Sequence, residues 1–292
     1  MALIPPGLCA DDASRRRFIR DFLTLTGWVF VGEVELIRSG SVAIAGDPKN
    51  DNKAWGTLKG RLLYDGEVPD RKEVDLEKAG IRGEDLKWFT STGPILNEDW
   101  VVDKQSKAVQ WVLVWLIPED PKGAALRVHD SLQSIDARQK AVVVDQLPRG
   151  YSSHVVGLRE GQDLVMKNSS PIAHVFNLPE FGRNLGFNRN MPSKTELTVS
   201  DLKAERFFTP ITCPPHPWER MWLRVFDHPY FAVTVEDGTF EIPLAPAGTC
   251  RLVVWQESMG YKGGRSGRFG SPVTIEGAAV NDLGDITIKP KT

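Results

Sequence analysis

The sequence lacks an excess of charge of either sign and also lacks a long apolar run. Its 292 residues carry 36 Lys and Arg against 38 Asp and Glu, which gives a net charge of −2. This balance argues against a nucleic-acid-binding protein, which needs a basic face. No stretch of about 18 uninterrupted apolar residues is present, so we expect no integral membrane span. Three cysteines are too few for a disulfide framework in a chain of this length.

The motifs of hydrolases and of phosphate-binding enzymes are also missing. The chain has no G-x-S-x-G elbow, no H-E-x-x-H helix, no Gly-rich phosphate loop and no alternation of strands with helices. Paired carboxylates at a recognisable spacing are absent as well. We therefore expect that this protein is not an enzyme.

Short apolar segments separated by turn residues dominate what is present. Gly (26) and Pro (20) are spread along the chain, and nine Trp lie mostly in short apolar runs. Residues 108–117 form an apolar run that ends at Pro118, which predicts a strand buried on both faces. Asp237-Gly238 between two alternating runs predicts a type I′ hairpin. We predict an all-β protein of two packed sandwiches, with short helices only near 71–79 and 130–140.

The N-terminal segment resembles a twin-arginine export signal. Ser14-Arg15-Arg16-Arg17-Phe18-Ile19-Arg20 precedes an apolar stretch over 22–31, and Ala43-Ile44-Ala45 fits the small-x-small cleavage rule. These features predict an exported, periplasmic or extracytoplasmic chain that begins at Gly46 after removal of residues 1–45. A polar linker over 46–54 follows. The alternative is an N-terminal extension of a cytoplasmic protein.

One short segment concentrates metal-ligating side chains. Cys213, His216 and Met221 supply a thiolate, an imidazole and a thioether, which together suit a soft, redox-active metal. A second imidazole is expected from an earlier strand, and His174 fits that place. Prolines follow both Cys213 and His216 and should stiffen the loop, because each fixes φ and removes a donor.

Residues 161–222 look like cupredoxins, since Cys-x-x-His with a Met five residues after the His matches the plastocyanin loop. The longer stretch 142–257 is similar to exported cupredoxin-like proteins named methylamine utilization proteins. Their motifs have counterparts here in Gly161-Gln162, Asn168, Pro171, His174, Cys213, His216, Trp218, the run from Asp227 to Thr234, Gly238 and Phe240.

The resemblance implies a cupredoxin-like Greek-key sandwich over 141–226 and a small Ig-like or transthyretin-like, carboxypeptidase-regulatory-like sandwich over 227–292. An N-terminal β region over 55–140 would pack on both. It also implies one copper ion held by His174, Cys213, His216 and Met221, and a function as a single-electron carrier. The partner would be a redox protein that docks near an exposed edge of His216.

The fourth ligand position stays open between two residues. Where the family has Met directly after the Trp, this chain has Glu219, and Met221 follows two residues later. Both side chains face the same side of an extended segment. We expect Met221 to be the axial ligand, because placing Glu219 at the site would desolvate a charge. The alternative function is a metal-free extracytoplasmic binding or structural module, in which Cys213 and Cys250 form a disulfide.

Overall fold

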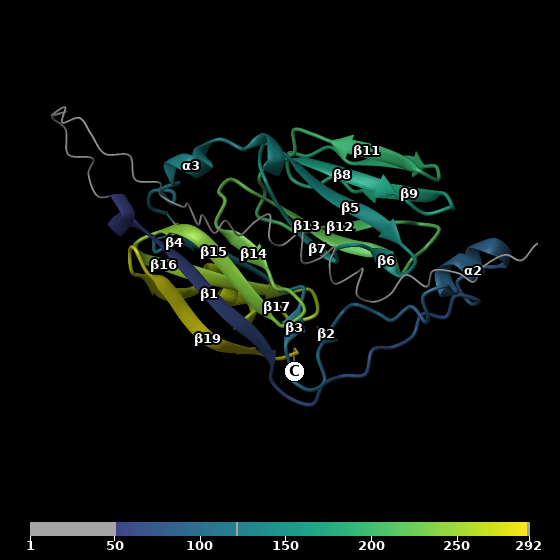
Figure 1. Cartoon of the computed structure of the whole chain (residues 1–292), viewed down its shortest axis with the longest axis horizontal. Helices are drawn as coiled ribbons and strands as arrows, with labels where there is room; N and C mark the ends of the chain where they lie inside the picture. The colour runs from purple at the N-terminus through teal and green to yellow at the C-terminus, as the bar shows by residue number, and fades with distance from the viewer. Residues whose placement is uncertain (1–50, 121, 291–292) are drawn as a thin grey trace, which may run out of the picture. The chain divides into compact units, whose positions relative to one another are not determined.

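The computed structural model describes residues 51–120 and 122–290 (Figure 1). The predicted export signal and its cleavage site therefore lie outside the described residues. Of the predicted linker, the last four residues form a short 3₁₀ helix, η1 (Asp51–Ala54). The described part of the chain is predominantly β-strand, which confirms the predicted all-β class. Within this part, no helix is long and apolar enough to cross a membrane.

The first sandwich is built from residues 141–226 and consists of two sheets. One has the order β10-β9-β12-β13-β7 and the other the order β11-β8-β5-β6. Alternate residues along the strands are buried, so each sheet turns one face toward a common core. The strands are β5 (Ala141–Leu147), β6 (Gly150–Tyr151), β7 (Val155–Arg159), β8 (Asp163–Asn168), β9 (His174–Leu178), β10 (Phe187–Met191), β11 (Thr195–Val199), β12 (Thr209–Thr212) and β13 (Arg220–Phe226).

The second sandwich combines strands from both ends of the described chain. A sheet with the order β15-β1-β19 packs against a sheet with the order β14-β4-β16-β17, to which β18 is added through β16. The strands are β1 (Trp55–Tyr64), β4 (Leu113–Pro118), β14 (Phe231–Val233), β15 (Thr239–Pro246), β16 (Gly248–Gln256), β17 (Gly260–Tyr261), β18 (Ser271–Ile275) and β19 (Val280–Ile288).

This pairing differs from the expected domain boundaries. The second sandwich is not confined to 227–292, because β1 pairs in parallel with β19 and β4 pairs with β16. Local sequence patterns carry no signal for such a pairing between distant segments. The two sandwiches are joined by apolar contacts, because one buried cluster packs β4 and β16 against the first sandwich. Its members are Leu113, Trp115, Val155, Phe226, Val253 and Trp255.

Three local expectations were wrong. Residues 71–79 form no helix, and the helix of this region is α2 (Gly83–Thr90). The strand predicted over 108–117 is interrupted at Trp111, whose φ is 65°, between β3 (Val109–Gln110) and β4. The runs on either side of Asp237-Gly238 enter different sheets, since β14 pairs with β4 and β15 pairs with β1.

The remaining short elements connect the sandwiches. β2 (Val101–Val102) pairs with β3, and α3 (Asp130–Gln133) and η2 (Ala137–Gln139) precede β5. The predicted helix over 130–140 is thus divided into two short pieces. The Gly- and Arg-rich loop after β17 forms η3 (Gly264–Phe269).

Candidate metal centre

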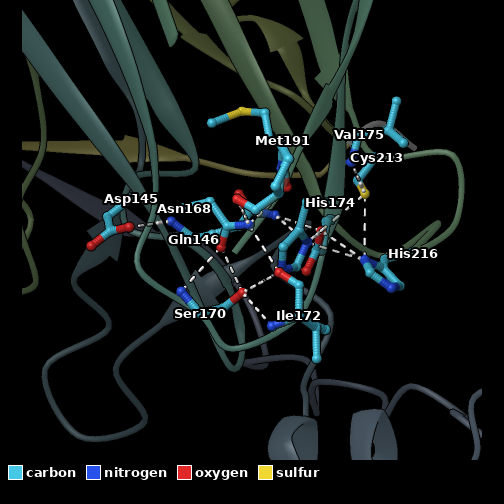
Figure 2. Close-up of polar contacts among 12 residues, drawn as sticks. Asp145, Gln146, Asn168, Ser170, Ile172, His174, Val175, Met191, Cys213 and His216 are labelled. Atoms are coloured by element: carbon cyan, nitrogen blue, oxygen red, sulfur yellow. Dashed lines mark hydrogen bonds and ion pairs between the residues drawn. The ribbon is translucent and has the colours of Figure 1, made fainter. Parts of the chain in front are cut away.

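Four potential ligand groups converge in the first sandwich, and Figure 2 labels three of them, His174, Cys213 and His216. His174 is the first residue of β9, Cys213 directly follows β12, and His216 and Glu219 lie in the loop that leads into β13. One ligand atom from each lies within 4.8 Å of the other three, and all four side chains are buried. The structure therefore brings together three of the four predicted site residues and adds Glu219.

The loop over 213–219 is closed by backbone hydrogen bonds. The N–H of Cys213 donates to the carbonyl of Glu219 at 3.1 Å, and the N–H of Glu219 donates to the carbonyl of His216 at 2.8 Å. Prolines at 214, 215 and 217 fix φ within it. The N–H of Val175 on β9 donates to Sγ of Cys213 at 3.3 Å. The loop thus holds its three polar side chains toward β9.

The ligand atoms are spaced as one small ion requires. Nδ1 of His216 lies 3.1 Å from Nδ1 of His174 and 3.4 Å from Sγ of Cys213. The Cys213 sulfur lies 4.0 Å from His174 Nδ1. Oε2 of Glu219 lies 3.0 Å and 3.3 Å from the two Nδ1 atoms. Ligands about 2.0–2.3 Å from a tetrahedral ion are separated by roughly 3.3–3.8 Å. The cluster has close to these dimensions.

Hydrogen bonds behind His174 determine which ring nitrogen faces the cluster. Oγ of Ser170 lies 2.6 Å from Oδ1 of Asn168, 2.9 Å from the carbonyl of Ile172 and 3.0 Å from Nε2 of His174. Asn168 Nδ2 donates to the carbonyls of Ile172 and Met191, so its Oδ1 is an acceptor. The single hydroxyl proton of Ser170 goes to one of these acceptors. With Ser170 Oγ as the acceptor, Nε2 of His174 can carry the ring proton, and a bound metal ion would then take the lone pair of Nδ1.

Burial controls the charge of the cluster. Burial raises the pKa of the Cys213 thiol to about 12, and the neighbouring Glu219 carboxylate adds to this rise. Burial would also raise the pKa of Glu219, but hydrogen bonds and charges from His174 and His216 outweigh it and lower that pKa. Without a cation the thiol keeps its proton while the carboxylate is ionised. A bound metal ion would displace the thiol proton.

The residues present fit a bound cation. Glu219 is fully buried, and its Oε1 has no hydrogen-bond partner among the described residues. An ionised carboxylate in the interior costs several kcal/mol unless a cation or several donors compensate it. One thiolate, two imidazoles and one carboxylate together suit copper or zinc.

A short apolar segment covers the imidazole edge of His216. Phe89 of α2 is fully buried, and its ring centroid lies 4.8 Å from that of His216 and 5.0 Å from that of Trp218. Trp88 packs edge-on against His174 at 5.9 Å. His216 is only 4% exposed. The expectation of an exposed His216 edge is therefore wrong, because α2 and the chain around it cover that side.

Met221 is part of the apolar core of the first sandwich. It pairs with Ile211 across β12 and β13, is fully buried, and belongs to the core cluster with Leu223 and Met166. The assignment of Met221 as axial ligand stays a prediction. The Glu219 carboxylate lies within 3.3 Å of Nδ1 of both imidazoles.

Two side chains that support the site were not predicted from the sequence. Gln146 of β5 donates from Nε2 to Glu219 Oε2 at 2.6 Å, and Ser170 orients His174. Ser170 could have been found in the Asn-Ser-Ser run before His174, while nothing around Gln146 marks it.

Both Cys213 and Cys250 are free in the structure, and Cys250 lies in the core of the second sandwich. The two residues therefore do not form the disulfide that was considered as an alternative.

No protein-family model and no curated protein matches this chain. Among solved structures, the reduced form of an amicyanin mutant matches with 19% identity and a TM-score of 0.27, over 30% of this chain and 83% of that chain. A Cu-containing nitrite reductase (NirK) from Thermus scotoductus SA-01 matches with 13% identity and a TM-score of 0.27, over 37% of this chain and 25% of that chain. These likenesses are too distant to carry an argument, so the case for a metal rests on the geometry of the site.

Proposed function

We propose that this protein binds one copper ion through Nδ1 of His174, Sγ of Cys213 and Nδ1 of His216, and carries single electrons outside the cytoplasm. The observation that carries the proposal is the convergence of these three buried ligand atoms within 4.0 Å of one another. The resemblance of residues 161–222 to cupredoxins agrees with it, and so does the N-terminal resemblance to an export signal. The partner would be a redox protein, and no substrate is transformed.

Copper, when bound, would supply a one-electron couple, and the chain would supply a rigid, dry setting for it. The closed loop over 213–219 limits the movement of Cys213 and His216, and the contact of Ser170 with Nε2 limits the movement of the His174 ring. Phe89 and Trp218 exclude water from the imidazole edge. A site that does not rearrange between two oxidation states needs little reorganisation, which favours rapid electron transfer.

A structural module that carries no electrons is the second candidate, and the covered edge of His216 favours it. A carrier usually offers a partner a short path to its metal, whereas this edge is packed against Phe89. The two candidates differ in a measurable way. A carrier loaded with copper is reduced and reoxidised by small soluble redox reagents without loss of metal, whereas a structural module binds no copper or loses it on reduction.

The experiment compares Cys213→Ala with Cys250→Ala after copper loading. The second variant removes an equally buried free thiol from the other sandwich and is the matched control. We expect an intense visible thiolate-to-Cu²⁺ band, with close to one copper per chain by mass spectrometry, in the wild type and in Cys250→Ala. Cys213→Ala should lose the band, because only a thiolate ligand produces it. A wild-type protein without copper, or an unchanged band in Cys213→Ala, would refute the proposal.

A further inference from the structure

We infer that Glu219, positioned by Gln146, is the fourth ligand of this centre, and that the centre therefore favours divalent ions over Cu⁺. The inference rests on the proposed copper site and specifies its ligand set and its metal preference. It replaces the thioether expected from the sequence with a carboxylate.

The position of the Glu219 carboxylate is the first argument. Its Oε2 lies 3.0 Å from Nδ1 of His174 and 3.3 Å from Nδ1 of His216, so it is on the same side as the Nδ1 atoms of both rings. Its other oxygen, Oε1, is buried without a hydrogen-bond partner among the described residues. A cation at the centre of the cluster would compensate the buried negative charge of this carboxylate.

Gln146 supplies the second argument, because it fixes the carboxylate from the opposite sheet. Gln146 lies on β5, is 4% exposed, and donates to Glu219 Oε2 at 2.6 Å. Its Nε2 also lies 3.0 Å from Nδ1 of His174. A donor behind a ligating oxygen holds that oxygen in one orientation, as partners behind metal ligands generally do. Gln146 is thus a positioning residue for Glu219.

Met221 lies in apolar surroundings. It pairs with Ile211 across β12 and β13 and belongs, with Leu223, to the buried core cluster of the first sandwich.

The chemistry of the ligand set gives the metal preference. A thioether is soft and neutral and stabilises Cu⁺, whereas a carboxylate is hard and anionic and stabilises divalent ions. Two imidazoles, one thiolate and one carboxylate also match the ligands of four-coordinate zinc sites. The centre should therefore bind Zn²⁺ and Cu²⁺ tightly and should hold Cu⁺ less well than a site with a thioether.

The test measures Zn²⁺ and Cu⁺ affinities by chelator competition, each with the metal alone. Glu219→Gln keeps the shape but removes the charge, and we expect it to weaken Zn²⁺ binding by at least about 10-fold while Cu⁺ binding changes much less. Glu219→Met should shift the preference further toward Cu⁺. Met221→Leu should alter neither affinity. Glu196→Gln removes an exposed carboxylate from β11 and is the control for the change in charge.

The outcomes separate this inference from the proposed function. Unchanged Zn²⁺ binding in Glu219→Gln, or a large loss of Cu⁺ binding in Met221→Leu, overturns the inference even if the wild type binds copper. A wild type that binds Zn²⁺ through Glu219 but takes up no copper supports the inference and refutes the proposed electron carrier. If Glu219→Gln fails to fold, Gln146→Leu tests the same carboxylate indirectly. It should weaken Zn²⁺ more than Cu⁺, and equal losses for both ions would count against the inference.

Discussion

At the scale of single residues, the geometry of the candidate metal centre depends on side chains outside the ligand set. Ser170 offers an acceptor to Nε2 of His174, because its own proton can go to Oδ1 of Asn168 or to the carbonyl of Ile172. This arrangement favours the tautomer that leaves the lone pair of Nδ1 for a metal ion. The ligand atom is therefore prepared by a chain of three residues that all lie between β8 and the start of β9.

Ser170→Ala should lower metal affinity by about 10-fold or more, since loss of a partner behind a metal-ligating imidazole commonly costs this much. The ring of His174 would then be free to turn, and its two tautomers would compete. Ser170→Thr keeps the hydroxyl and should restore part of the affinity. Ser169→Ala, at the neighbouring partly exposed serine, should leave affinity unchanged. Zn²⁺ affinity measured by chelator competition distinguishes these variants. An equal loss in Ser169→Ala would indicate a general effect on the loop instead.

His174, Cys213 and His216 could be named as candidate ligands from the sequence, because residue type and spacing are local properties of a tight loop and one strand. The proximity of Glu219 to them could not be predicted. The desolvation cost expected for Glu219 applies to a carboxylate without partners, whereas the structure supplies a donor from Gln146 on a different sheet and two imidazoles beside it. Whether a buried charge is tolerated depends on tertiary neighbours, and the local sequence does not name them.

At the scale of elements, strands were easier to predict than the segment that covers the site. β1 and the strands of the first sandwich show alternation or short apolar runs between turn residues. The cover over the centre is different. Its buried residues Leu76, Ile81, Phe89 and Ile95 follow neither a helical nor a strand period, and charged residues separate them. A segment that packs apolar side chains at irregular intervals gives no periodic signal, so only the structure reveals α2 as a cap.

We expect the cap formed by α2 to slow the release of a bound metal ion into solvent. Phe89→Leu removes the aromatic ring that contacts His216 and Trp218 but keeps an apolar side chain, so the protein should still fold. We expect a chelator in excess to remove metal from this variant several-fold faster than from the wild type, while the visible spectrum of the copper form is unchanged. Phe269→Leu, at a 45% exposed ring in η3, is the control and should exchange like the wild type. Equal rates in both variants would mean that metal leaves by another route.

At the scale of the whole described molecule, a buried ionic network connects the two sandwiches next to the apolar cluster that joins them. His154, in the bend before β7, forms an ion pair through Nε2 with Glu257 and lies 3.3 Å through Nδ1 from Glu98. Glu257 follows β16, and it also accepts from Arg220 at 3.0 Å and from Trp222 at 2.6 Å on β13. The segment that carries the cap, the first sandwich and the second sandwich therefore share one set of charges.

This network predicts that stability falls at alkaline pH. Burial alone would lower the pKa of His154, but the Glu257 and Glu98 carboxylates outweigh it and raise that pKa from 6.5 to about 9. Because the folded pKa lies above the unfolded one, the stabilisation is fully present below pH 6.5 and is lost as the pH rises through about 9. The loss should be on the order of 2–3 kcal/mol in the free energy of unfolding. Urea unfolding at pH 6.5 and pH 9.5 measures it.

His154→Gln should remove most of this pH dependence, because an uncharged amide still fills the site but binds no proton. His129→Gln is the control, since His129 hydrogen-bonds Ser131 and stacks edge-on against Trp55 without pairing with a carboxylate. Its loss of stability between the two pH values should equal that of the wild type. If His154→Gln instead keeps the full pH dependence, other groups carry it, and the two sandwiches are held together by their apolar cluster without a contribution from this charge.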